Sequence, residues 1–457
     1  MSSAELPEPD PGRPFIRWLW TSNPFYVISA GLFLFGLRES FGAGTREVDT
    51  WALMGGLAGY TLLLAAAALL LVRFARVWDD VRTVLLLVVL MFLATSVTFD
   101  ELLMLEPERG IPFNLGGFAF AVLVSEGVLR GIRLRLPALF RVPYHLTLAL
   151  FFLYPVALTQ LPRDGHSEAM LWGLWGFAPA AGLVFLTLLP AIRRGAEYVR
   201  DTGSPWPWPF YPWSVFVFLG AAVCGRAFLL CWSMHQPSRM SDLVFGPYFL
   251  VPFGFAITVI VLELGIVSGS RITRWVALAM PAGLVVLAGV GLRTDAIATE
   301  FLGHFANRLG GTPLFVALLT AGSFYLYAWV RRVPHAVEGM TAVLAALSVI
   351  GPETLTIPNA TGTRVGMLVA AVGLQLVLAL LRRDGWRLIV GGLIAGIWLS
   401  YAGWRGYRTL REEVPGLDYL AAGLALFPVA VLISLGKAGI LARWWNLMWR
   451  RMLNARV

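Results

Sequence analysis

Charged residues are scarce in this 457-residue sequence. They make up 14% of it, whereas hydrophobic residues make up 58%. A water-soluble protein presents a surface with roughly 25–35% charged residues, so this composition excludes a soluble protein of that length. Stretches of about 20 apolar residues recur from end to end, and each is long enough to cross about 30 Å of hydrocarbon. The sequence therefore predicts an all-α fold, a polytopic bundle of transmembrane helices.

Lysine is almost absent: Lys437 is the only one, against 35 arginines. We attribute this bias to the base composition of a bacterial genome, and we expect the protein in the inner (plasma) membrane. The net charge of +9 does not indicate a nucleic-acid partner, because the basic residues are spread over short connections and form no single face. The expected partners are membrane lipids instead.

Cysteine and histidine are also rare, and neither predicts a cofactor. Cys224 and Cys231 lie seven residues apart in one apolar run, about 10 Å apart on a helix, which is too far for a disulfide. The five histidines fall at span ends or in loops, where they cannot serve as axial haem ligands inside helices. The three on the predicted outer side, His166, His235 and His304, have no HxxH or HxxE spacing, and the sequence has no phosphate-binding GxxxxGK[ST] loop.

A metal site remains as an alternative on the predicted outer side. There, His166, His235 and His304 lie beside acidic residues. We favour ordinary loop histidines, and hence neither a metal nor an organic cofactor.

Fourteen apolar segments are predicted to span the membrane. They are Pro24–Phe41, Trp51–Val72, Thr83–Leu105, Ile111–Leu129, Val142–Leu161, Met170–Ile192, Trp213–Met234, Leu243–Val267, Trp275–Leu292, Pro313–Val330, Ala336–Ile350, Val365–Leu381, Leu388–Trp404 and Tyr419–Gly436. The first and the eleventh are the weakest, being short or interrupted by charge. All connections are too short for a folded soluble domain.

The distribution of arginine tests this assignment independently. If both termini are cytoplasmic, the outer loops carry only 11 basic residues: Arg38, Arg46, Arg109, Arg163, Arg239, Arg293, Arg308, Arg364, Arg405, Arg408 and Arg411. Arg226 lies inside a span, and the other 24 basic residues fall in inner segments. An inner excess above two to one is what the positive-inside rule predicts. Removing one span would invert part of the chain and spoil this alternation.

This topology predicts which loops an impermeant reagent can reach. Single cysteines replacing Arg109, Asp164 or Asp295 in a cysteine-free background should react with a charged maleimide added to whole cells. Cysteines replacing Arg133, Arg194 or Arg383 should react only after the cells are permeabilised. The reverse labelling pattern would refute cytoplasmic termini.

The predicted organisation has three parts. Residues 1–22 form a polar, proline-rich N-terminal segment, and residues 23–436 form one membrane domain of about 14 helices. Residues 437–457 combine arginines with tryptophans and methionines, which is typical of a cationic helix lying on the inner leaflet.

Three ionisable residues in the spans form the main candidate site. Asp100 and Glu101 lie four or five residues from the outer end of the third span, about 7 Å deep. Arg226 lies about 12 Å deep in the seventh span. An unpaired arginine at that depth costs a few kcal/mol, so we expect it to contact one of the two carboxylates. Such a cluster is either an ion pair that locks two helices or part of a substrate- or proton-linked site.

A second candidate is the acidic pair Glu47-x-Asp49 in the predicted first outer loop. It resembles the acidic pairs of polytopic glycosyltransferases that use lipid-linked sugars. The resemblance implies that Glu47 and Asp49 would serve as a base or as metal ligands. It covers three residues, and those enzymes have a much longer first outer loop than the roughly ten residues expected here.

The sequence leaves three function classes open. A transporter or a lipid or glycan flippase fits the span number and the many helix-breaking residues, and would take a lipophilic or lipid-linked small molecule. A glycosyltransferase-like membrane enzyme rests on Glu47 and Asp49. A non-catalytic scaffold or assembly subunit, with other membrane proteins as partners, fits the scarcity of polar residues in the spans. We favour the first class, and a protein that is not an enzyme.

Overall fold

The computed structural model describes residues 24–41, 47–75, 77–161, 168–200, 202–206, 208, 210–234, 245–290, 296–350, 360–382, 385–413 and 426. These residues form helices and their connections, and contain no strand. The chain divides into two compact units, residues 1–365 and 366–457. The described structure is therefore all-α, as the composition predicts.

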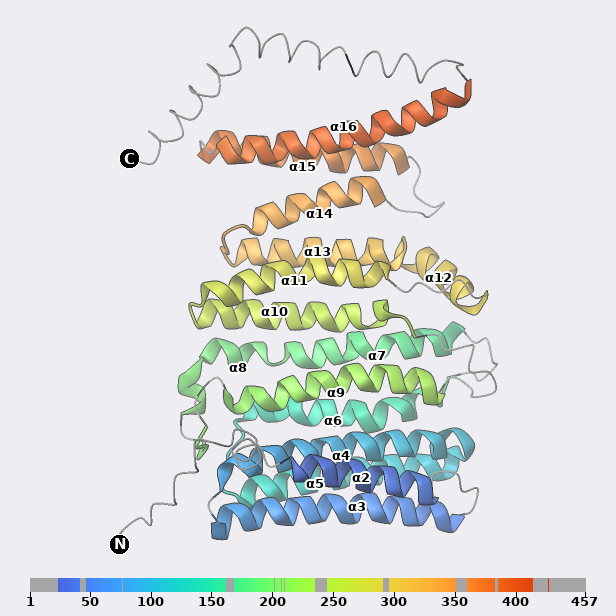
Figure 1. The fold of residues 1–457 in the computed structure, drawn as a ribbon, viewed down its shortest axis with the longest axis vertical. Coiled ribbons are helices and arrows are strands. Elements are labelled where there is room, and N and C mark those ends of the chain that lie inside the picture. The colour runs from blue at the N-terminus through green and yellow to red at the C-terminus, as the bar shows by residue number, and fades with distance from the viewer. Residues whose placement is uncertain are drawn as a thin grey trace. The chain divides into compact units, whose positions relative to one another are not determined.

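The first unit is a row of mostly antiparallel helices (Figure 1). They are α2 (Phe25–Phe41), α3 (Glu47–Leu70), the π-helix η1 (Leu71–Ala75), α4 (Trp78–Leu105), α5 (Pro107–Gly131), α6 (Ala138–Leu158), α7 (Glu168–Leu186), α8 (Leu189–Arg194), the 3-10 helix η2 (Ala196–Val199), α9 (Phe210–Met234), the 3-10 helix η4 (Pro247–Leu250), α10 (Val251–Val267), α11 (Arg271–Gly289), α12 (Ala296–Leu309), α13 (Pro313–Val330) and α14 (Ala336–Ile350).

Two helices organise this unit. Helix α4 packs against α2, α3, α5, α6 and α9, whereas α10 packs against α7, α8, α11 and α13. The chain does not follow spatial order between them, because α10 lies against α7 rather than against its sequence neighbour α9 (Figure 1). As a result, helices that are far apart in the sequence, such as α7 and α10, become neighbours in the bundle.

The second unit is described in α15 (Ala360–Arg382), which begins just before the boundary, and α16 (Gly385–Glu413). Ala371, Gln375 and Ala379 are buried at intervals of four residues along α15, which places them on one face. A Cβ atom on Gly391 of α16 would lie 3.4 Å from the Cβ atom of Gln375. Small side chains therefore allow the two helices to approach closely.

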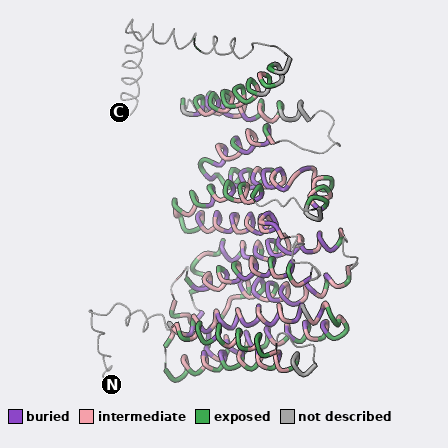
Figure 2. The backbone as a smooth tube through the Cα atoms, turned by 45° about the vertical axis from the view of Figure 1, so that its right-hand side comes forward, coloured by how far each residue is buried: buried purple, intermediate pink, exposed green. Residues whose placement is uncertain are grey.

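Ten segments among the described residues are long and apolar enough to cross a membrane. Many of their large apolar side chains are exposed, such as Phe74 at 82%, Ile272 at 78% and Val217 at 73%. Figure 2 shows buried and exposed positions interleaved along the same helices. In water this much exposed apolar surface would cause aggregation, whereas in lipid it faces hydrocarbon. The chain is a multi-pass membrane protein.

The helices differ from the predicted spans at two places. The sixth span is divided into α7 and α8, because Pro190 has no N–H group and its ring clashes with a helical carbonyl one turn earlier. The predicted loop after the ninth span contains α12, an amphipathic helix that buries Phe301 and Phe305. Glu300 and Arg308, which flank these two positions, conceal the helix from a search for apolar runs. The fourteenth span and the segments 1–22 and 437–457 lie outside the described residues, apart from position 426.

Candidate functional site

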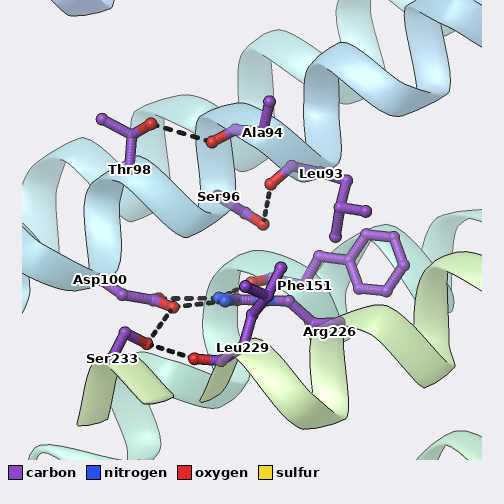
Figure 3. A network of polar contacts seen from close by, with 9 residues as sticks. All are labelled: Leu93, Ala94, Ser96, Thr98, Asp100, Phe151, Arg226, Leu229 and Ser233. Carbon is purple, nitrogen blue, oxygen red and sulfur yellow. Dashed lines mark hydrogen bonds and ion pairs between the residues drawn. The ribbon is translucent and has the colours of Figure 1, made fainter. Parts of the chain in front are cut away.

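Arg226 and Asp100 lie against each other in the interior of the first unit (Figure 3). The guanidinium of α9 meets the carboxylate of α4 with both terminal nitrogens: Nη1 donates to Oδ2, and Nη2 donates to Oδ1 at 2.7 Å. Nη2 also donates to the backbone carbonyl of Phe151 on α6 at 3.0 Å. The contact therefore joins α4, α6 and α9.

Ser233 completes this cluster. Its Oγ lies 2.9 Å from Asp100 Oδ2 and 2.9 Å from the carbonyl of Leu229 in its own helix. The side chains of Arg226 and Asp100 are 0% exposed. A bidentate, fully buried pair of this kind holds helices together and leaves no atom of Asp100 open to a substrate. Its geometry favours a helix lock.

The other residues of the two sequence candidates are placed less fully. Glu101 lies in α4, and its side chain is outside the described part of the chain. Glu47 and Asp49 were predicted in a loop, but they occupy the first turn of α3. Their side chains are likewise outside the described residues.

A third cluster, centred on Glu263, was not predicted as a site. Glu263 of α10 is 0% exposed, and its carboxylate accepts hydrogen bonds from Arg331 Nε at 2.7 Å and Arg331 Nη2 at 3.0 Å. The hydroxyl of Tyr327 donates to Oε1, and Arg193 Nε donates to Oε2 at 3.4 Å. Arg193 Nη2 also donates to the Tyr327 hydroxyl at 3.2 Å. Two arginines against one carboxylate leave this cluster with a net charge of +1.

The sequence holds one signal for the Glu263 cluster. Glu263, Arg193 and Arg331 all fall at predicted inner span ends. Nothing local pairs them, because the two arginines lie 70 and 68 residues from Glu263 along the chain.

An apolar groove lies beside this cluster and shares Tyr327 with it. It has a volume of about 500 Å³ and lies between α7, α10 and α13. Trp175, Tyr248 and Phe305 line one end, and Tyr327 lines the other. Leu183 also lines it and is 68% exposed, so the groove opens sideways toward lipid. From Pro313 to Tyr327 the α13 wall is about 21 Å long by helix rise.

Glu126 has basic partners on two helices. Helical spacing allows it to pair with Arg130, one turn later, and the structure contains that contact at 3.8 Å, with Arg130 78% exposed. The main partner is Arg141 of α6, and His145 Nε2 lies 3.4 Å from the same carboxylate. Packing of α5 on α6 decides this choice, since it presents a second arginine to a carboxylate that is only 15% exposed.

The outer histidines form no metal site in the described structure. His304 of α12 lies 3.7 Å from Glu168 and 3.8 Å from Glu300. Arg308 forms an ion pair with Glu168, with 2.8 Å between Nη2 and Oε1, and its guanidinium lies over the ring of Trp172. His166 and His235 are outside the described residues. No group of three or more potential metal ligands occurs among the residues described. These contacts attach α12 to α7, at the end opposite α8 (Figure 1).

Comparisons with known proteins assign no family to this arrangement. No protein family matches the sequence, and neither a curated protein nor a solved structure is significantly similar to it. The function is therefore inferred from the groove and the clusters alone.

Proposed function

We propose that this membrane protein moves an amphipathic lipid or a lipid-linked small molecule across the bilayer, as a transporter or flippase. The observation that supports the proposal is the groove between α7, α10 and α13, which adjoins the net positive Glu263 cluster at Tyr327. An apolar chain fits the groove, and an anionic head group fits the arginines. The groove volume of about 500 Å³ falls within the range of small-molecule sites.

The exposure of the groove and of Arg193 supports access from the bilayer. The Arg193 side chain is 51% exposed although it also contacts Glu263, so its guanidinium can meet a head group without breaking the cluster. Leu183 and Ser323 line the groove and are exposed at its side. A lipid can enter such a groove laterally and need not pass through water.

The orientation forms part of the same proposal. Arg141, Arg193, Arg271 and Arg331 lie at one end of the first unit, which we term the arginine-rich end. The hydrogen bond from Leu139 N to the Tyr198 hydroxyl, at 3.2 Å, joins the start of α6 to the segment after α8 at this end. By the positive-inside rule the arginine-rich end is cytoplasmic. We propose, with this orientation, fourteen spans, two cytoplasmic termini and a location in a bacterial inner membrane.

A scaffold is the second candidate, favoured by the closed geometry of the Asp100–Arg226 pair. This pair and the Glu126 contacts attach helices to one another, and the Asp100–Arg226 pair is fully buried. A protein that only organises other membrane proteins would need such contacts and would not need the groove. No observation on the described residues favours the glycosyltransferase-like alternative.

Filling the groove distinguishes these candidates. Ser323 lines it and hydrogen-bonds only to the Leu319 carbonyl of its own helix, so Ser323→Trp places an indole in the groove at little structural cost. Leu319→Trp is the matched control, because Leu319 is 43% exposed on the same helix and does not line the groove. Purified protein in vesicles should accelerate the bleaching by dithionite of a fluorescent phosphatidylglycerol or polyprenyl phosphate.

We expect Ser323→Trp to reduce this rate to that of protein-free vesicles and Leu319→Trp to leave it unchanged. Equal rates for wild-type protein and protein-free vesicles with both lipids would contradict the transporter proposal and favour the scaffold. Equal rates for wild-type protein and Ser323→Trp would show that lipid takes another route.

A further inference from the structure

A second cavity lies at the arginine-rich end, between the start of α11 and the turn that joins α13 to α14. It has a volume of about 390 Å³. The described residues that line it are Arg271, Arg274, Trp275, Leu278, Val333, Pro334 and His335. Every ionisable side chain in this set is basic. It is separate from the groove, since the two cavities share no lining residue.

The charge in this cavity is only partly compensated. Arg274 donates to the carbonyl groups of Ser270 at 3.3 Å and Gly269 at 3.5 Å, which are neutral acceptors. Arg271 is exposed and forms no hydrogen bond or ion pair with any residue that the structure describes. The nearest carboxylate to His335 is Glu338, with 4.0 Å between Nδ1 and Oε1. Arg271 and Arg274 are one helical turn apart, so both face the cavity.

The aromatic wall of the cavity is held in place by the turn. The ring of His335 stacks on Trp275, with ring centroids 4.8 Å apart and an angle of 27° between the planes. His335 adopts a φ of 67°, and Arg332 adopts a φ of 57°, which non-glycine residues rarely do. The cavity thus has an aromatic side that carries one basic ring.

The cavity continues onto an apolar surface that faces lipid. Ile272 and Val276 of α11 are 78% and 49% exposed, and Trp275 is 56% exposed between them. Tryptophan favours the boundary between head groups and hydrocarbon. A molecule that fills the cavity therefore meets arginines at its polar end and a hydrocarbon surface beside it. A free inorganic anion would use only the first of these features.

We propose that this cavity binds the phosphodiester head group of an anionic membrane phospholipid, with the acyl chains lying along the exposed face of α11. Basic pockets between transmembrane helices at the cytoplasmic surface are suited to such head groups. Arg271 and Arg274 contact the phosphate oxygens, and Trp275 packs against the glycerol region. The site requires only that the chain lies in a membrane, so it does not depend on the transport proposal.

Photocrosslinking tests this site locally. A benzophenone amino acid replaces Ile272, which adjoins the cavity without lining it, or Val286, which is 64% exposed about 21 Å further along α11. Each protein is placed in phosphatidylcholine vesicles that contain a minor share of phosphatidylglycerol, and the crosslinked lipid is identified by mass spectrometry. We expect phosphatidylglycerol to be enriched roughly tenfold over its bulk share at position 272 and not at position 286.

Charge variants extend the test. In Arg271→Gln with Arg274→Gln the enrichment at position 272 should disappear. In Arg73→Gln with Arg130→Gln, which removes the same charge from exposed positions at the same end, it should persist. If the first variant does not fold, the difference in phosphatidylglycerol enrichment between positions 272 and 286 still tests the proposal. Equal enrichment at both positions, enrichment that survives in the first variant, or displacement of the lipid by excess inorganic phosphate would each overturn the proposal.

Discussion

Asp100→Asn is expected to destabilise the protein by about 3–5 kcal/mol, the usual cost of removing one partner from a buried ion pair. Asparagine has nearly the same shape as aspartate but carries no charge. Arg226 is 0% exposed and its guanidinium would then have only the carbonyl of Phe151 and neutral groups around it. A buried arginine without a counter-ion is among the most costly groups in a membrane interior. Thermal unfolding of purified protein in detergent, followed by size-exclusion chromatography, measures the loss.

The double variant Asp100→Asn with Arg226→Met distinguishes the interaction within the pair from the interactions that each residue makes with its surroundings. Removing both charges should recover most of the stability, and the double-mutant cycle should give a coupling free energy well above about 1 kcal/mol. Thr98→Val is the control on the same helix, because the Thr98 hydroxyl hydrogen-bonds only to the Ala94 carbonyl. Strictly additive single effects, or a loss in Asp100→Asn no larger than in Thr98→Val, would contradict the lock.

The same double variant tests whether the cluster takes part in the activity. If it folds and moves lipid at the wild-type rate, Asp100 and Arg226 only join helices. If it folds and is inactive, the two residues belong to the working site. The sequence left both roles open, and the closed geometry favours the first.

Gly110→Ala is expected to destabilise the protein, although alanine is the better helix former. A Cβ atom on Gly110 of α5 would lie 2.4 Å from the Cα atom and 2.8 Å from the nitrogen of Leu103 in α4. These are backbone atoms, so the two helices must separate to admit a methyl group. Overpacking of this kind costs about 1–3 kcal/mol, which exceeds the gain in helix propensity of about 1 kcal/mol.

Gly116→Ala provides the control in the same helix. No heavy atom lies within 4 Å of a Cβ atom built on Gly116, so only the propensity term acts and the melting temperature should rise. The prediction is a pair of shifts with opposite signs, measured by thermal unfolding in one detergent. Shifts of the same sign would show that α4 and α5 do not approach closely at Gly110.

In the described chain, the spans predicted from the sequence agree with the observed helices better than the predicted connections agree with the observed ones. Helices α4, α9 and α13 each cover their predicted span, because about 30 Å of hydrocarbon imposes a minimum length and a low polarity on every crossing. The connections are under no such constraint. Glu47 and Asp49 therefore begin a helix instead of lying in a loop, and the loop before α13 contains α12.

The candidate sites depend on different kinds of information. Asp100 and Arg226 are visible in the sequence as deep charges, and the cost of an unpaired charge in hydrocarbon makes a contact between them predictable. The Glu263 cluster and the groove are not visible, since both require α10 to lie against α7 and α13. The sequence of no single helix indicates that α10 packs against α7 and α13.

The sequence by itself determined the membrane class, the all-α fold and the position of most helices in the described chain. These are local properties, set by how each segment of chain interacts with lipid and water. Only the tertiary structure decided which helices are neighbours, which arginines share Glu263 and where cavities open. Apolar helices in lipid associate through small residues, shape and polar contacts rather than through a hydrophobic face, so their periodicity does not identify their partners.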